Sequence, residues 1–227
     1  MGQTLRNVPN LHWIVVEDAD NQTPSINSLL QRSCVSFTHL AARDKEKTLR
    51  GRGPFQRNRA LQWLRDIYPL GNATALHEQP PTYKGVVYFA DDDNTYDVRL
   101  FGLMRNVRKV GIWAVGLVGG AKVETPLVQN STVVRWLVSF SPRREFATDM
   151  AGFAVNLNLL LSRPSARFHS GCGGGHLEPC FLSQFGIKRA DLEPIGFDNP
   201  YGKREILVWH TKTRSSGSAQ GDKGFLV

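Results

Sequence analysis

The order of apolar and polar positions predicts an alternation of strands and helices in the first part of the chain. A β-branched run at residues 12–17 predicts a strand, and Pro24 is placed to open a helix over 24–30. Residues 37–40 predict a second short strand, and apolar residues at helical spacing predict a helix over 55–67. The expected order is therefore strand, helix, strand, helix.

The alternation continues through the middle of the chain. Residues 85–90 form a continuous apolar run, as expected for a strand buried on both faces. A helix is predicted over 98–107 and a strand over 111–118. The later elements are a strand at 133–140, an apolar segment at 149–161, a short helix at 178–185 and a strand at 206–209. This order predicts an α/β fold with a mainly parallel, twisted sheet and flanking helices.

Composition narrows the class of protein. With 227 residues, of which 41% are hydrophobic, the chain can bury one substantial core, so disordered and fibrous classes are excluded. The formal charge of +8 favours anionic ligands such as phosphates, acidic sugars or nucleic acid. Nucleic acid is disfavoured, because only Phe55 and Trp63 lie as aromatic platforms near the basic segment 43–59. No apolar run is long enough to cross a membrane.

The cysteines leave several interpretations open. Three cysteines exclude a small disulfide-rich scaffold. The spacing of His169, Cys172, His176 and Cys180 superficially suggests zinc, although few zinc sites pack all ligands so tightly. A disulfide between Cys172 and Cys180, or two free thiols, is favoured over zinc.

Asp91, Asp92 and Asp93 follow the apolar run 85–90. Consecutive carboxylates repel one another, and the ends of strands in α/β sheets form the ligand crevice. A hard divalent cation that also binds substrate phosphates would satisfy them. The alternative is an exposed acidic turn that caps a helix beginning near Asp97.

Other charged residues are candidates for chemistry, each with a plainer alternative. Arg52 and Arg57 can clamp an anion, or can belong to a solvated basic surface. Glu178 follows the Gly-rich stretch 171–175 and can act as a general base, or can simply favour the first turn of a helix. Further candidates, by default surface charges or a structural histidine, are Glu124, Arg144, Asp149 and His210.

Several short blocks, in order and spacing, resemble the animal β-1,3-glucuronosyltransferases over residues 7–213. The blocks are Val8-Pro9-Asn10-Leu11-His12-Trp13 with Glu17-Asp18, Gln56-Arg57-Asn58 with Trp63-Leu64-Arg65, Phe89-Ala90-Asp91-Asp92-Asp93-Asn94-Thr95-Tyr96, Asp149-Met150-Ala151-Gly152-Phe153-Ala154-Val155, His176-Leu177-Glu178, Asp191-Leu192-Glu193-Pro194 and Val208-Trp209-His210-Thr211. Several blocks in the same order identify the family far more specifically than any single block does.

The resemblance implies a Rossmann-like glycosyltransferase A-type fold, and inverting transfer of glucuronic acid from UDP-glucuronate to a terminal galactose with Mn²⁺. It implies that Asp93 binds the metal and that Glu178 deprotonates the attacking hydroxyl. The donor would be bound by Asp18 at the uracil, Asp91 and Asp92 near the uridine and ribose, and Arg52, Arg57, His210 and Lys212 near the glucuronate and diphosphate. Glu124, Arg144 and Asp149 would hold acceptor hydroxyls.

The resemblance also implies features that this sequence lacks. The catalytic domain of family members begins with a strand and helix that carry a Pro-Thr-Tyr segment. A membrane anchor and a stem precede this domain, which lies in the Golgi lumen. The chain therefore resembles an N-terminally truncated member. Lys212 stands where the family has Arg. The lysine keeps the positive charge but cannot form the two parallel hydrogen bonds of a guanidinium.

The expected division is a UDP-sugar and metal subdomain at 1–125, an acceptor subdomain at 126–213 and a flexible tail at 214–227. The acceptor is expected to be the proteoglycan linker Gal-Gal-Xyl-protein, and a homodimer is compatible with the resemblance. The alternatives are a glucuronosyltransferase acting on N-acetyllactosamine ends and an inactive UDP- or glycan-binding fragment.

Overall fold

The computed structural model describes residues 1–44, 53–70, 81–169, 172, 175–197 and 204–211. Contacts within the chain divide it into two compact units. The N-terminal unit comprises Gly2–Gly85 and Leu157–Leu177, and the main unit comprises Val86–Asn156 with the described residues from Glu178 onward. Each unit is described by itself.

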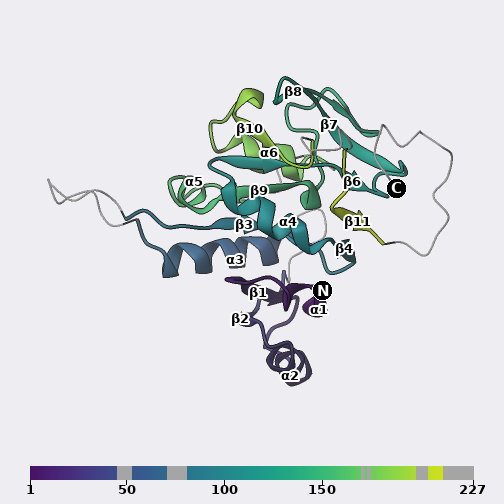
Figure 1. The fold of residues 1–227 in the computed structure, drawn as a ribbon. Helices are drawn as coiled ribbons and strands as arrows, with labels where there is room; N and C mark the ends of the chain where they lie inside the picture. Colours follow the sequence, from purple (N-terminus) through teal and green to yellow (C-terminus); the bar gives the residue numbers. More distant parts are fainter. Residues whose placement is uncertain (45–52, 71–80, 170–171, 173–174, 198–203, 212–227) are drawn as a thin grey trace, which may run out of the picture. The chain divides into compact units, whose positions relative to one another are not determined.

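The N-terminal unit is built on a pair of parallel strands (Figure 1). β1 (His12–Glu17) lies in register with β2 (Ser36–Ala41), and α2 (Pro24–Arg32) connects them. α3 (Pro54–Ile67) packs on both strands. Pro24 and Pro54 are the first residues of these helices. Proline has no backbone N–H, and at this position an N–H would have no partner within the helix. The predicted order of strand, helix, strand, helix is confirmed. The remaining helices of this unit are α1 (Gly2–Leu5) and α5 (Leu157–Leu161).

The main unit contains two mixed sheets with short helices beside them (Figure 1). The first sheet has the order β10 (Leu192–Pro194), β5 (Val110–Ile112), β9 (Phe153–Asn156), β3 (Val86–Tyr88). The second has the order β4 (Asn94–Tyr96), β11 (Val208–His210), β6 (Val115–Gly116), β7 (Val123–Gln129), β8 (Thr132–Leu137). The helices are α4 (Val98–Leu103), α6 (Leu177–Ser183) and the 3-10 turns Met104–Asn106, Met150–Gly152 and Arg189–Asp191.

Aromatic side chains fill the core of the main unit. The ring of Phe181 lies 5.5 Å from Phe89 and 5.1 Å from Phe185, each in an edge-to-face arrangement. Trp113 is 2% exposed, and its indole N–H donates to the carbonyl of Ala151 at 2.8 Å. This core therefore anchors the segment around Ala151, which follows one of the candidate site residues.

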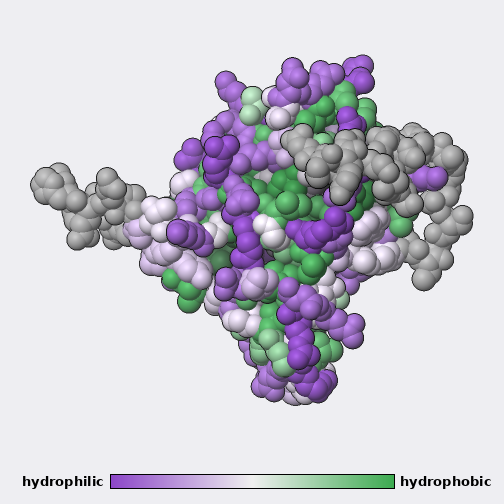
Figure 2. Space-filling view, viewed as in Figure 1, coloured by the Kyte–Doolittle hydropathy of each residue, from purple (hydrophilic) through white to green (hydrophobic). Residues whose placement is uncertain are grey.

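Some large hydrophobic side chains of the main unit remain at the surface. Val98, Leu103, Val134 and Phe140 are exposed. Figure 2 shows hydrophobic residues reaching the surface among hydrophilic ones. Scattered exposure of this kind is ordinary and by itself marks no binding surface.

The prediction of an α/β fold is confirmed, but the prediction of a mainly parallel sheet is wrong for the described strands of the main unit. Only β10 with β5 and β11 with β6 pair in parallel there. β9 inserts antiparallel between β5 and β3, and β6, β7 and β8 form an antiparallel run. Strand direction depends on partners far apart in the sequence, which local patterns do not reveal.

Two predicted strands differ from the structure in informative ways. The run 111–118 is split between β5 and β6, which belong to different sheets, although residues 110–116 are all buried. Because both strands are buried, the sequence shows one continuous apolar run, and the break between β5 and β6 could not be predicted from it. The run 85–90 was expected to be buried on both faces, but β3 is an edge strand whose Val86, Val87 and Tyr88 are half-buried.

The sulfurs of Cys172 and Cys180 are not available as zinc ligands. Cys172 and Cys180 are disulfide-bonded and Cys34 is free and exposed. Sulfurs held in a disulfide are not thiolate ligands, so the zinc interpretation is set aside.

The boundary expected at residue 125 falls inside β7, so it does not coincide with the edge of a compact unit. The division by donor and acceptor stays a prediction. The tail at 214–227 lies outside the described residues. No helix in the described ranges combines the length and apolar character needed to span a bilayer.

Candidate active site

The turn that carries Asp91, Asp92 and Asp93 joins β3 to β4 in the main unit. Tyr96 donates its hydroxyl to the carbonyl of Asp91 at 2.6 Å. Thr211 donates both its N–H, at 3.3 Å, and its hydroxyl, at 2.7 Å, to the carbonyl of Asp93. These contacts use main-chain oxygens, so they fix the turn without using the carboxylate of Asp93.

The helix after this turn has its own cap. Asp97 is the N-cap of α4, and its carboxylate accepts the N–H of Arg99 at 2.9 Å. The aspartates at 91–93 are therefore not needed to cap the helix, and the helix-capping alternative is wrong.

The donor set of the turn fits a hard divalent cation. Asp93 is exposed, and carboxylate oxygens are the ligands that such ions prefer. Within the described ranges, no three His, Cys, Asp or Glu ligand atoms gather at this turn. Asn94, next along the chain, is 6% exposed. The turn thus suits an ion that takes its other ligands from phosphate and water, rather than one enclosed by protein.

His210, at the end of β11, lies among the predicted donor residues. Its Nε2 is 3.0 Å from Oδ1 of Asp149. This hydrogen bond raises the pKa of His210, burial opposes it, and the charges of Asp93 and Asp91 raise the pKa further. The structure therefore brings His210 together with Asp149, Asp91 and Asp93, which are far apart in the sequence.

We expect Asp149→Asn to lower the pKa of His210, because it removes the largest contribution that raises it. His210 has a folded pKa above its ordinary value of 6.5, so its stabilising contribution is fully present below about pH 6.5 and is lost as the pH rises through the folded pKa. The substitution should therefore destabilise the protein more at pH 6 than at pH 9.

An NMR titration of His210 and urea unfolding at both pH values would test this expectation. Asp66→Asn, on α3 of the other unit, is the control and should leave the His210 titration unchanged. An unaltered His210 pKa in Asp149→Asn would contradict the pairing.

Asp149 and Glu124 line the same small pocket of the main unit. Its other walls include Trp113, Trp136 and Thr148. Glu124 is 9% exposed, and its Oε1 accepts the N–H of Ser139 at 2.8 Å. The pocket brings these two carboxylates near each other, but it has room for about one water molecule and both tryptophans are buried. The acceptor roles predicted for Glu124 and Asp149 therefore stay predictions.

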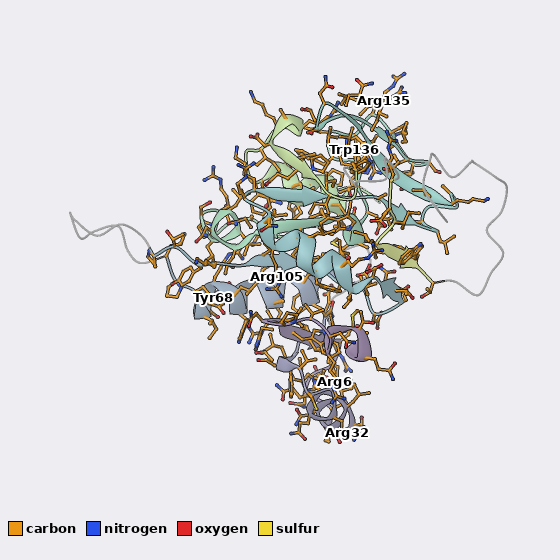
Figure 3. All side chains as sticks on the ribbon, in the orientation of Figure 1. Arg6, Arg32, Tyr68, Arg105, Arg135 and Trp136 are labelled. Carbon is orange, nitrogen blue, oxygen red and sulfur yellow. The ribbon has the colours of Figure 1, made fainter. Side chains whose placement is uncertain are left out.

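The tryptophans of this pocket were not among the predicted site residues. Trp136 alternates along β8 with exposed Arg135, and Figure 3 labels both on that strand. The indole N–H of Trp136 donates to the carbonyl of Glu145 at 2.9 Å, so its ring is held in place. Strict alternation would not have shown that Trp136 points inward, because Val134 and Arg135 are both exposed and the β7–β8 register shifts between Leu127 and Val128.

Arg144 links the pocket region to Glu178. Its guanidinium lies 5.0 Å from the ring of Phe140 and donates to the carbonyls of Phe140, at 2.9 Å, and Ser141, at 3.2 Å. Burial lowers the pKa of Arg144, while the charges of Glu178 and Glu124 act to raise it. Glu178 stands in the first turn of α6 and is half-buried. Arg144, Glu124 and Glu178 thus lie within electrostatic range of one another.

The predicted donor residues Asp18 and Arg57 belong to the N-terminal unit. Asp18 is exposed and directly follows β1. Arg57 is in the first turn of α3, with its guanidinium 6.0 Å from the ring of Phe168. Asn58 holds Phe168 in place, since it donates to the Phe168 carbonyl at 2.7 Å and accepts its N–H at 2.8 Å. Arg52 and Lys212 lie outside the described residues.

The sequence is similar to known glycosyltransferases. The sequence profile of glycosyltransferase family 43 matches residues 1–214. Galactosylgalactosylxylosylprotein 3-beta-glucuronosyltransferase 3 of Mus musculus is 44% identical over 234 residues, which cover 98% of this chain and 68% of the mouse protein. Galactosylgalactosylxylosylprotein 3-beta-glucuronosyltransferase 1 of Homo sapiens is 44% identical over 237 residues, 99% of this chain and 67% of the human protein. Galactosylgalactosylxylosylprotein 3-beta-glucuronosyltransferase sqv-8 of Caenorhabditis elegans is 43% identical over 224 residues, 94% of this chain and 58% of the worm protein.

Proposed function

Because the chain belongs to glycosyltransferase family 43, we propose that it transfers glucuronic acid from UDP-glucuronate to the 3-hydroxyl of a terminal galactose. The acceptor that we propose is the proteoglycan linker Gal-Gal-Xyl-protein, the class given in the names of the relatives. One observation carries the proposal. Asp149 forms a hydrogen bond with His210, which is proposed to bind UDP-glucuronate, and it lines the same pocket as Glu124, which is proposed to bind the acceptor. The groups proposed for the two substrates therefore meet at Asp149.

Glu178 acts as the general base in this proposal. It removes the proton of the 3-hydroxyl as that oxygen bonds to the anomeric carbon, and the bond from that carbon to UDP breaks on the opposite face. The sugar configuration therefore inverts. Arg144 lies within electrostatic range of Glu178. A single base suffices, whereas an inverting glycosidase needs a second carboxyl group to protonate its leaving group.

The leaving diphosphate is stabilised by positive charge. His210, Arg57, Arg52 and Lys212 are the groups of this chain proposed to bind the diphosphate and the glucuronate carboxylate. Asp93 would hold Mn²⁺, which when bound supplies further positive charge as a Lewis acid. Asp91 and Asp92 would bind the uridine and ribose, and Asp18 the uracil. The Asp93 turn, with its exposed carboxylate, supports this assignment.

The acceptor galactose is proposed to bind beside Arg144 and Phe140, near Glu124 and Asp149. Phe140 is 50% exposed and stacks with Arg144, so it can present an apolar face to a sugar ring. We propose that the reaction takes place in the Golgi lumen, where the resemblance locates the family.

Gly119 is expected to matter for the acceptor because it makes room for Glu124. Gly119 has φ +62°, and a Cβ there would lie 2.5 Å from Oε1 of Glu124. Gly119→Ala should therefore displace that carboxylate and raise the KM for the acceptor, while UDP affinity stays the same.

Gly120→Ala is the matched control. Gly120 has φ +81°, but a Cβ there would meet nothing within 4 Å. Each substitution should cost about 1–2 kcal/mol of stability through the left-handed backbone. Steady-state kinetics and thermal unfolding separate the two effects. Equal acceptor KM values in the two variants would contradict the assignment of Glu124.

The function itself is tested by mass spectrometry of the products formed from UDP-glucuronate with Mn²⁺. A β-1,3-linked digalactoside and N-acetyllactosamine are compared as acceptors. Product from the digalactoside supports the proteoglycan linker as the acceptor. Product from N-acetyllactosamine alone would instead identify N-acetyllactosamine ends as the acceptor. UDP binding without product from either would identify a UDP-binding protein without transferase activity.

A further inference from the structure

A buried polar cluster lies at the carboxyl end of the parallel pair β1 and β2, in the N-terminal unit. Glu17 is the last residue of β1, and His39 lies on β2 beside it. Nε2 of His39 is 3.1 Å from Oε2 of Glu17. The carboxyl ends of parallel strands are where α/β folds bind ligands, so this cluster stands where a binding loop begins.

His39 is held in one orientation. It is 7% exposed, and its Nδ1 is buried with no hydrogen-bond partner in the described part of the chain. Since the carboxylate can only accept, Nε2 carries a hydrogen and donates it to Glu17. His39 therefore fixes the position of one carboxylate oxygen of Glu17.

Glu17 in turn fixes the far end of the following loop. The backbone N–H of Thr23 donates to Oε2 of Glu17 at 2.9 Å, and the Thr23 hydroxyl donates to Oε1. These bonds hold the pKa of Glu17 below its ordinary value, so its ionised form is the one that grips Thr23. Gln22 adds a bond to the carbonyl of His39 at 2.5 Å. The loop 18–22 is thus pinned at both ends.

A second contact on this loop is weaker. Arg43 donates to Asp20 at 2.8 Å, but both side chains are about half exposed, and ion pairs of that kind contribute little. Glu17, His39 and Thr23 supply the less exposed hydrogen bonds of the loop.

We propose that Glu17, His39 and Thr23 are positioning residues for nucleotide recognition, because they fix the loop that begins with Asp18. The inference rests on the proposed function, in which Asp18 contacts the uracil. A carboxylate can accept the N3–H of uracil, whereas N3 of cytosine carries no hydrogen and would face it as a second acceptor. A correctly placed Asp18 therefore selects UDP over CDP, and a displaced one loses part of that selection.

The test compares the Kd values of UDP and CDP, measured by calorimetry in Mn²⁺. Thr23→Val and His39→Gln should each weaken UDP binding by roughly tenfold and reduce the UDP/CDP ratio by a similar factor. Thr23→Ser, which keeps the hydroxyl, should restore wild-type values. Asp18→Ala should abolish the selection.

His12→Gln is the matched control. His12 also bridges the two strands, with Nδ1 2.9 Å from the Ser36 hydroxyl and Nε2 2.8 Å from the Thr38 hydroxyl, but it stands at the amino end of β1. It should leave the UDP/CDP ratio unchanged even if it lowers stability. Thermal unfolding of every variant separates loss of fold from loss of selection.

The outcomes separate this inference from the proposed function. No UDP binding by the folded wild-type chain would overturn the proposed function and this inference with it. Normal UDP binding with an unchanged UDP/CDP ratio in Thr23→Val and His39→Gln would overturn the positioning role alone. An equal loss of selection in His12→Gln would also overturn it, because the effect would then come from general weakening of the strand pair.

Discussion

Glu178→Gln should abolish glucuronate transfer while UDP affinity stays near that of the wild type. The amide keeps the size of the side chain but cannot accept the proton of the attacking hydroxyl, and a positioned general base contributes roughly 10²–10⁴-fold to a rate. The donor should be unaffected, because the base acts on the acceptor. Transfer from UDP-glucuronate to a digalactoside, read by mass spectrometry, and UDP calorimetry measure the two effects.

Glu205→Gln is the control for this experiment. Glu205 lies in the same unit and pairs at 3.0 Å with Arg99, whose side chain is exposed, so its loss should change neither turnover nor binding. A Glu178→Gln variant that transfers at the wild-type rate would remove Glu178 as the base. A large loss of UDP affinity would instead indicate that Glu178 helps to bind the donor nucleotide.

The groups that we propose for transfer were indicated only in part by the sequence. Asp91, Asp92 and Asp93 could be singled out because consecutive carboxylates after an apolar run require an explanation. Their turn is where the sequence placed it, although β3 proved to be an edge strand. The position of a candidate site could therefore be predicted even where the sheet topology could not.

The pairing of His210 with Asp149 could not be predicted from residue types. The two residues are 61 positions apart, and they meet only because β11 enters the second sheet between β4 and β6. By itself each is an ordinary histidine or aspartate at the end of an element. The resemblance to a family assigned them roles, and the structure supplies their contact.

The helices were predicted better than the strands for a physical reason. Pro24 and Pro54 mark the starts of α2 and α3, and helical hydrogen bonds join residues close in sequence. β7 was not predicted, because Pro126 falls inside it and a proline argues against a strand. Its pairing with β8 turns at Asn130 and Ser131, which both have positive φ.

Asp93→Ala should remove the metal dependence of UDP binding. If Asp93 holds Mn²⁺, the UDP affinity of the variant in Mn²⁺ should fall to that of the wild type in a chelator. Loss of a residue that merely supports a metal ligand already costs about 10–100-fold, so loss of the ligand itself should cost more. Calorimetry with and without Mn²⁺ gives both values, and Asp66→Ala provides the same change of charge in the other unit.

The fold should survive this substitution, and that makes the result decisive. Tyr96 and Thr211 hold the turn through the carbonyls of Asp91 and Asp93, and neither bond uses the side chain that is removed. An unchanged melting temperature with lost metal dependence would therefore assign the loss to the ligand rather than to the turn. If Asp93→Ala still bound UDP with normal Mn²⁺ dependence, Asp93 would not be the ligand, and the neighbouring Asp91 and Asp92 would be the carboxylates to test in its place.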